Sequence, residues 1–323
     1  MSRSDAVWLV VAVAAVSTSG PLVREAAVPA LAIAFWRNGL AAGGVVPVAV
    51  ARRRRATPGV GAATRATPAT AAPTSLTATL RASMPGGAAP WALAAVAGLL
   101  LAAHFAAWIS SLSSTTVAAS VALVATQPVW AALIGRLTGE RLAAGAWLGI
   151  AVALAGVLVV TGFAVGSSGR TLRGDVLALA GGVLAAAYVS VGAVVRRHLT
   201  TTDYTAACYS VAAAALLVAA VAAGQPLAGF DAKAWWCIVA ITVGPQLLGH
   251  SVFNRLLRTV GATVVSVAVL GEIVGSALLA AWWFGERPPA GLVPGAACII
   301  AGVVLVARGR AARLAEDEEV VAG

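Results

Sequence analysis

The chain has 323 residues, of which 60% are hydrophobic and only 11% are charged, and its mean hydropathy is +0.91. A soluble domain carries about 25% charged residues, so the composition excludes an ordinary globular protein and indicates a membrane protein. The formal net charge of +10 at pH 7 does not indicate nucleic-acid binding, because most arginines lie in short segments between apolar blocks.

Ten apolar blocks follow one another along the chain, most of them about 20 residues long, which is enough for a helix to cross a hydrocarbon core. A β-barrel would show shorter segments of alternating hydrophobicity. The first block follows Arg3 as in a signal peptide, but about 18 residues is long for a removable segment, so we expect it to be retained. The predicted spans are 6–23, 28–50, 90–109, 114–135, 144–164, 174–195, 204–224, 234–253, 263–284 and 290–307.

Two segments lie outside these blocks. Residues 51–89 are rich in alanine, threonine and proline with isolated arginines, and this composition predicts a disordered cytoplasmic loop. Residues 311–323 form a charged tail that we expect to be solvated in the cytoplasm.

The basic residues predict the orientation of the chain. With a cytoplasmic N-terminus, 16 of the 22 lysines and arginines fall on the inner side, five fall on the outer side, and Arg37 falls within a span. Cytoplasmic loops carry an excess of these residues. We therefore predict a multi-pass protein of the cell membrane (plasma or inner membrane) with both termini in the cytoplasm.

The two halves of the sequence repeat each other. A shift of 146 positions places His104 on His250, Ser120 on Ser266, and Gly-Glu-Arg at 139–141 on Gly-Glu-Arg at 285–287. Histidine occurs only three times, so composition does not explain the match. Each half holds five spans, and an odd number makes the second half enter the membrane from the opposite side. The predicted fold is an all-α integral membrane protein with ten transmembrane helices in a 5+5 inverted-topology repeat, with halves at 1–165 and 166–310.

Three segments carry a resemblance to a known family: "AIAFWRNGLAA", "SLSSTTVAASVALVATQPVWAALIGRLTGERL" and "LGEIVGSALLAAWWFGER". They resemble EamA-type members of the drug/metabolite transporter superfamily. In that family a helix with a mid-span proline, or a Glu-Pro pair, ends in Gly-Glu some residues later. Here Pro128 precedes Glu140 by 12 residues, and Glu272 precedes Glu286 by 14. Ile273 stands where proline commonly follows the glutamate, so we predict no helix break in the ninth span.

Two ionisable residues lie inside spans, Arg37 in the second and Glu272 in the ninth. A charge at the bilayer centre costs about 2.5–3.5 kcal/mol on insertion scales, so such groups face a protein interior or a wet cavity. Two interpretations are open. The pair could neutralise each other, or Arg37 could attract an anionic group such as a substrate carboxylate while Glu272 holds an ammonium group or exchanges a proton.

Further polar side chains predict a shared cavity. In the eighth span a stripe at spacing four lies on one helix face, and it comprises Thr242, Gln246, His250 and Asn254. His104 and Trp108 occupy the third span, the partner of the eighth in the repeat. The two histidines therefore line the cavity or form helix–helix hydrogen bonds. The remaining cavity candidates are Gln127, Tyr188 and Tyr209.

Glycines recur at small-xxx-small spacing in the fifth and tenth spans, at Gly145 and Gly149 and at their repeat partners Gly291 and Gly295. Such faces allow close helix packing. The contact would lie within the monomer or between the subunits of a homodimer.

The resemblance implies a secondary transporter of small metabolites, amino-acid-like or drug-like, that exports them by alternating access through a midplane cavity. Uptake or exchange by the same fold is the alternative, and an intramembrane enzyme is a remote one, since no catalytic motif is present. We expect no catalytic residue and no cofactor. We also expect no metal site, because Cys208, Cys237 and Cys298 have no metal-binding spacing. Proton coupling stays open. The expected partners are a small-molecule substrate and the lipid bilayer, not nucleic acid.

Overall fold

The computed structural model describes residues 1–56, 89–111, 114–115, 117–140, 142–161, 172–285 and 287–322. Its regular elements are helices throughout this part of the chain. Most of the predicted loop at 51–89 lies outside the described residues, as does Glu286. Residues 51–56 are described and are helical, contrary to our prediction. They continue the second span because arginines at the C-terminal end of a helix interact favourably with its dipole.

Within the described residues, ten spans are long and apolar enough to cross a membrane, as predicted. Six are single helices: α3 (Ala30–Ala56), α5 (Ala89–Ser111), α8 (Ala144–Thr161), α9 (Leu172–Val195), α10 (Thr201–Ala222) and α15 (Leu292–Ala322). Four are interrupted: α1 (Arg3–Ser17) with α2 (Ser19–Ala26), α6 (Val117–Val124) with α7 (Gln127–Leu137), α11 (Ala232–Ile241) with η1 (Thr242–His250) and α12 (Ser251–Leu256), and α13 (Gly261–Val269) with α14 (Gly271–Phe284).

The ninth span tightens at Leu270, the single residue between α13 and α14, and the backbone of Leu270 stays right-handed helical, so the span continues through this break in the regular α-helix. The N–H of Leu270 donates to the carbonyl of Val267 (3.1 Å), and the N–H of Ile273 donates to the carbonyl of Leu270 (3.2 Å). These i→i+3 bonds tighten the turn without a proline. Gly271 follows directly, and glycine is a weak helix former. The fourth span breaks at the corresponding place, before Pro128, so both halves share this irregularity.

The eighth span contains a π-helical turn, η1, with Pro245 inside it. Proline lacks the N–H of a regular helix, so the ladder is disturbed at this point. The N–H of Ser251 donates to the carbonyl of Gln246 across the wider turn. That carbonyl also accepts from the hydroxyl groups of Tyr209 (3.3 Å) and Ser251 (3.3 Å). The wide turn is therefore held by side chains as well as by the backbone.

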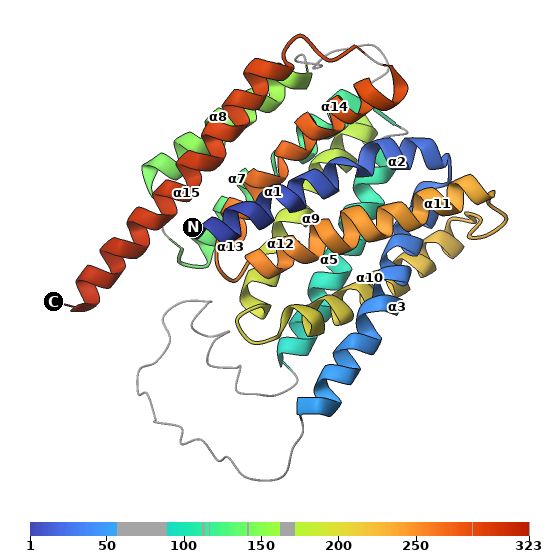
Figure 1. Cartoon of the computed structure of the whole chain (residues 1–323), viewed down its shortest axis with the longest axis horizontal. Coiled ribbons are helices and arrows are strands. Elements are labelled where there is room, and N and C mark those ends of the chain that lie inside the picture. Colours follow the sequence, from blue (N-terminus) through green and yellow to red (C-terminus); the bar gives the residue numbers. More distant parts are fainter. Residues whose placement is uncertain are drawn as a thin grey trace.

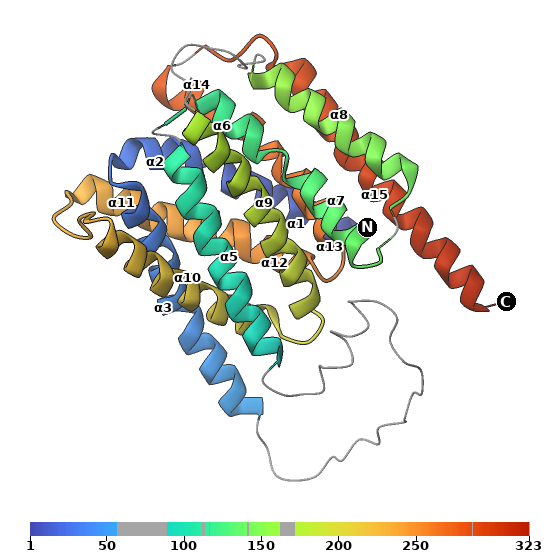
Figure 2. The same ribbon diagram turned by 180° about the vertical axis from the view of Figure 1, so that it is seen from behind.

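The helices pair across the two halves as the repeat requires. The pairs α3 with α10 and α8 with α15 each join a span to its own repeat partner. The contact of α5 with α9 joins spans three and six, and its repeat equivalent, spans eight and one, is the contact of η1 with α1. In Figure 1, α8 and α15 run side by side along one edge, and both chain termini lie toward the same end of the bundle. Figure 2 shows α5 and α9 side by side in the middle.

The α8–α15 contact is a close approach of two backbones. A Cβ added at Gly156 would lie 2.6 Å from the carbonyl oxygen of Gly295, and one at Gly302 would lie 2.5 Å from that of Gly149. No side chain fits at these distances. Of the four glycines predicted to mediate packing, Gly149, Gly291 and Gly295 pack within the monomer, whereas Gly145 faces open space.

We predict that Gly156→Ala destabilises the protein, whereas Gly145→Ala in the same helix leaves stability unchanged or slightly higher. The added methyl group must push the α15 backbone away, and overpacking of this kind costs about 1–3 kcal/mol. Thermal unfolding of the purified protein in detergent measures the difference. Equal midpoints for the two variants would show that α8 and α15 do not depend on this contact.

Candidate functional site

A cavity lies between spans from both halves, close to the breaks in the fourth and ninth spans. Its space amounts to about 730 Å³ when the open solvent at its mouth is included, and its enclosed volume is about 80 Å³. Eight of the ten predicted site residues line it: Arg37, His104, Trp108, Gln127, Tyr188, His250, Asn254 and Glu272. The remaining two, Tyr209 and Gln246, are fully buried and hydrogen-bonded behind this lining.

Arg37 on α3 is only 1% exposed. Its Nε donates to Oε1 of Gln246 (2.8 Å), and Nε2 of Gln246 donates to Oδ1 of Asn38 (3.0 Å). Its guanidinium carbon lies 4.3 Å from the centre of the Phe105 ring. It forms no ion pair with Glu272, although both residues lie in the described part of the chain. Of the two interpretations, mutual neutralisation by direct contact is therefore not what the structure shows.

The two histidines flank one aromatic ring. Phe105 lies 5.1 Å from the His104 ring and 5.6 Å from the His250 ring, measured between ring centres. Nδ1 of His104 lies 2.9 Å from the carbonyl oxygen of Gly181. A carbonyl only accepts, so Nδ1 carries the proton and a neutral His104 keeps Nε2 as an acceptor. The ring of Trp108 is parallel to that of His104 at 6.0 Å.

Asn254 on α12 is held from two sides. Its Oδ1 accepts from the Tyr188 hydroxyl (2.7 Å), and its backbone carbonyl accepts from Nε of Arg196 (3.0 Å).

Two residues at the site, Phe105 and Arg196, were not predicted from the sequence, and Arg196 was counted only among the basic residues that set the orientation. Phe105 could have been found because it directly follows His104 in a span that was predicted to face the cavity. The Arg196 contact depends on tertiary geometry that no spacing reveals.

Gln127 connects the fourth span to the ninth. Its Nε2 donates to the hydroxyl of Ser266 on α13 (3.2 Å). Ser120, the repeat partner of Ser266, hydrogen-bonds to Ser111 on α5 (2.6 Å between the hydroxyl oxygens). The two equivalent serines thus both anchor broken spans to a neighbouring helix.

The ninth span is packed differently on the two sides of its break. In α13 most residues are buried: Gly261, Thr263, Val264, Val265, Ser266, Val267 and Ala268. In α14 none is buried. The fourth span follows the same pattern, since residues 121–124 of α6 are only half-buried while α7 buries five residues. The half of each of these two spans that lies away from the chain termini is therefore the less buried one.

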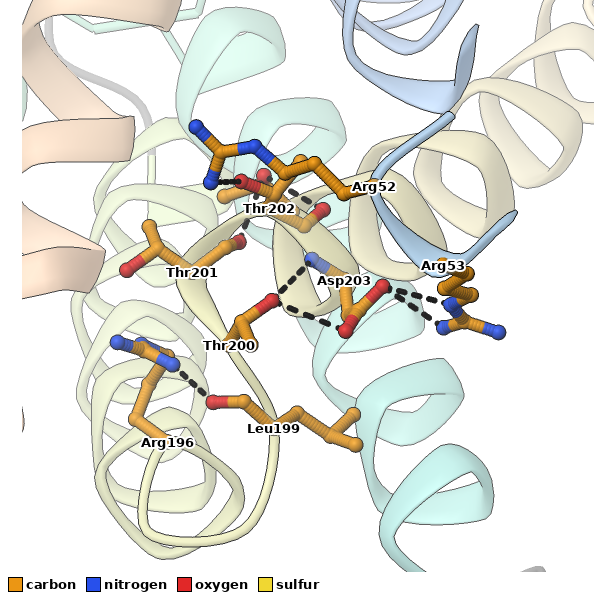
Figure 3. Close-up of polar contacts among 9 residues, drawn as sticks. Arg52, Arg53, Arg196, Leu199, Thr200, Thr201, Thr202 and Asp203 are labelled. Carbon is orange, nitrogen blue, oxygen red and sulfur yellow. Dashed lines mark hydrogen bonds and ion pairs between the residues drawn. The ribbon is translucent and has the colours of Figure 1, made fainter. Parts of the chain in front are cut away.

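A polar cluster lies where the C-terminal end of α3 meets the N-terminal end of α10, and Figure 3 shows its contacts. Arg53 of α3 contacts Oδ1 of Asp203 on α10 through both Nε and Nη2, each at 2.8 Å, and its guanidinium lies over the Trp91 ring at 4.2 Å. Arg52 donates to the Thr202 hydroxyl (3.4 Å). These contacts join α3, α5 and α10 at this point.

Among the described residues, no group of three or more His, Cys, Asp and Glu side chains is arranged to hold a metal ion. The lining instead offers one guanidinium, one carboxyl group, two imidazoles, amides and aromatic rings. Such a set can bind a small polar or zwitterionic molecule through its charged and hydrogen-bonding groups.

Comparisons with known proteins agree with this architecture. The sequence model of the EamA-like transporter family matches residues 4–162 and 172–308. Seventeen chains of solved structures match the fold. One of them, entitled "Crystal structure of protein", has a TM-score of 0.71 and 20% sequence identity to this chain. The match covers 94% of this chain and 96% of that chain. None of the curated proteins compared with the chain matches it. With nearly its whole length matched in two repeats, the chain belongs to the EamA-like transporter family and is a multi-pass membrane transporter.

Proposed function

We propose that the protein exports small amino-acid-like or drug-like metabolites as a secondary transporter, by alternating access through the central cavity. The observation that carries the proposal is the lining itself. Ionisable and amide groups from both halves meet in one cavity, next to two symmetry-related helix breaks. Transporters built from inverted repeats hold their substrates at such an interface.

The packing supports alternating access. The Arg53–Asp203 cluster joins α3 and α10 at the termini end, whereas the parts of the fourth and ninth spans at the opposite end are less buried. Because the halves are related by an in-plane twofold, each half can adopt the conformation of the other. This exchange would close the bundle at the end away from the termini and open it at the end with the Arg53–Asp203 cluster. With the termini in the cytoplasm, where the basic residues concentrate, this conformation faces outward.

Glu272 is the group we propose for proton coupling. It lies in the cavity without an ion-pair partner among the described residues, near the middle of the ninth span. A carboxyl group that reaches both sides in turn can carry a proton inward while substrate leaves. An ionisable residue in this position is costly to insert and is typically functional.

We predict that Glu272→Gln lowers coupled efflux to about a tenth or less while expression and thermal stability stay close to wild type. The amide keeps the size of the side chain and removes its proton exchange. Efflux of labelled amino acids from loaded proteoliposomes, with and without a pH gradient across the membrane, provides the measurement. Wild-type flux in the variant would remove Glu272 from the mechanism, and gradient-independent flux in the wild type would favour facilitated uptake or exchange over export.

We predict that Asp203→Asn loosens the termini end and raises accessibility of the cavity from that side by up to about fivefold, because an exposed ion pair contributes about 0.2–1 kcal/mol. The readout is labelling of Leu257→Cys, a buried lining position, by an impermeant maleimide from the cytoplasmic side, with the three native cysteines replaced by alanine.

Glu25→Gln is the matched control for Asp203→Asn. It removes a similarly exposed ion pair, with Lys233, at the opposite end of the bundle. It should leave the labelling rate unchanged or lower it. If both variants raise labelling from the cytoplasmic side equally, the Arg53–Asp203 pair does not act as a gate.

A further inference from the structure

Two arginines are buried in the described part of the chain, and the protein uses them differently. Arg196 is 5% exposed, and its Nε and Nη1 donate to the backbone carbonyls of Asn254 and Leu199. Arg37 is 1% exposed and donates only through Nε, to Gln246, while its Nη2 has no hydrogen-bond partner in the protein. The Arg196 guanidinium is thus occupied by the fold, whereas the outer edge of the Arg37 guanidinium is not.

The Arg37 guanidinium is fixed in place although its outer edge is free. Gln246 must accept from Nε through Oε1, and its amide is oriented by Asn38, whose Nδ2 in turn donates to the carbonyl of Ala34 (2.8 Å). The Phe105 ring covers one face of the guanidinium. The group therefore has a set orientation, with Nη1 and Nη2 forming the edge that remains for a ligand.

Like Nη2 of Arg37, two more donors in residues that line the cavity lack a hydrogen-bond partner in the protein. Nδ2 of Asn254 and the hydroxyl of Ser19 are buried and have no hydrogen-bond partner in the protein, and both residues line the same cavity as Arg37. A buried donor left without a partner is unfavourable, because it has lost its hydrogen bonds to water and gained none in return. Three such donors in one lining indicate that an acceptor-rich group normally enters.

We propose that the Nη1–Nη2 edge of Arg37 is the binding site for a carboxylate group of the transported molecule, with Asn254 as a second polar contact. A guanidinium presents a planar pair of donors that matches a carboxylate in a bidentate arrangement. Asn254 lies eight positions beyond Gln246, roughly 10–12 Å further along the span. It would therefore meet a different part of an extended ligand. The assignment rests on the proposed function, because it takes the cavity as the substrate site.

The experiment measures binding without transport, so that its failure is distinguishable from a failure of the proposed export. Full-length protein in detergent is titrated at constant ionic strength with matched pairs that differ only in charge: benzoate with benzamide, and phenylalanine with phenylalaninamide. Thermal shift and tryptophan fluorescence report binding, since Trp108 lies in the lining. We expect the carboxylate of each pair to bind about tenfold or more tightly than its amide, as charge-assisted bidentate bonds require.

Arg37→Gln should reduce this ratio to about one, and Arg37→Lys, a point charge without the fork, should give an intermediate ratio. Arg196→Gln is the matched control and should keep the wild-type ratio, because that guanidinium serves the fold. Should Arg37→Gln fail to fold, the wild-type ratio and the lysine variant still decide. Equal binding of the paired ligands, or no binding of either, overturns the assignment. Tighter binding of phenyl phosphate than of benzoate overturns the carboxylate in favour of a phosphate group.

Discussion

The architecture depends on the need to satisfy polar groups that the sequence places inside a hydrocarbon layer. Arg37 cannot reach water from the second span, so its Nε is bonded to Gln246, its face is covered by Phe105, and Gln246 is in turn bonded to Asn38. This chain of contacts joins the second, third and eighth spans around one guanidinium. Arg37 and Phe105 also line the central cavity, and Nη2 of Arg37 has no hydrogen-bond partner in the protein.

The twofold relation between the halves explains why that space is central. Contacts between spans three and six recur between spans eight and one, and the breaks in the fourth and ninth spans fall at nearly equivalent positions. The halves are not identical, however. The third span is a regular helix, whereas its partner, the eighth, contains a π-helical turn around Pro245. The extra width of that turn places Gln246 where it can bond to both Arg37 and Asn38.

Much of this could be predicted from the sequence, because apolar length, charge distribution and internal repetition are one-dimensional signals. The ten spans, the 5+5 repeat and the convergence of eight predicted residues such as His250 and Glu272 on one cavity follow from them. The tightened turn at Leu270 was not predicted, because such a turn beside a glycine needs no proline. The role of Arg196 was missed because its acceptors are backbone carbonyls, which have no sequence signature. Whether the cavity residues bind substrate stays a prediction.

The glycine contact between α8 and α15 has a consequence for how this architecture diversifies. Neither helix contributes a described side chain to the cavity, and their spacing is limited by backbone atoms rather than by cargo. Mutations that change which molecule is transported can therefore accumulate in the other spans without disturbing the α8–α15 contact. We would expect relatives with unrelated cargoes to keep small residues at Gly149, Gly156, Gly295 and Gly302 while their lining residues diverge.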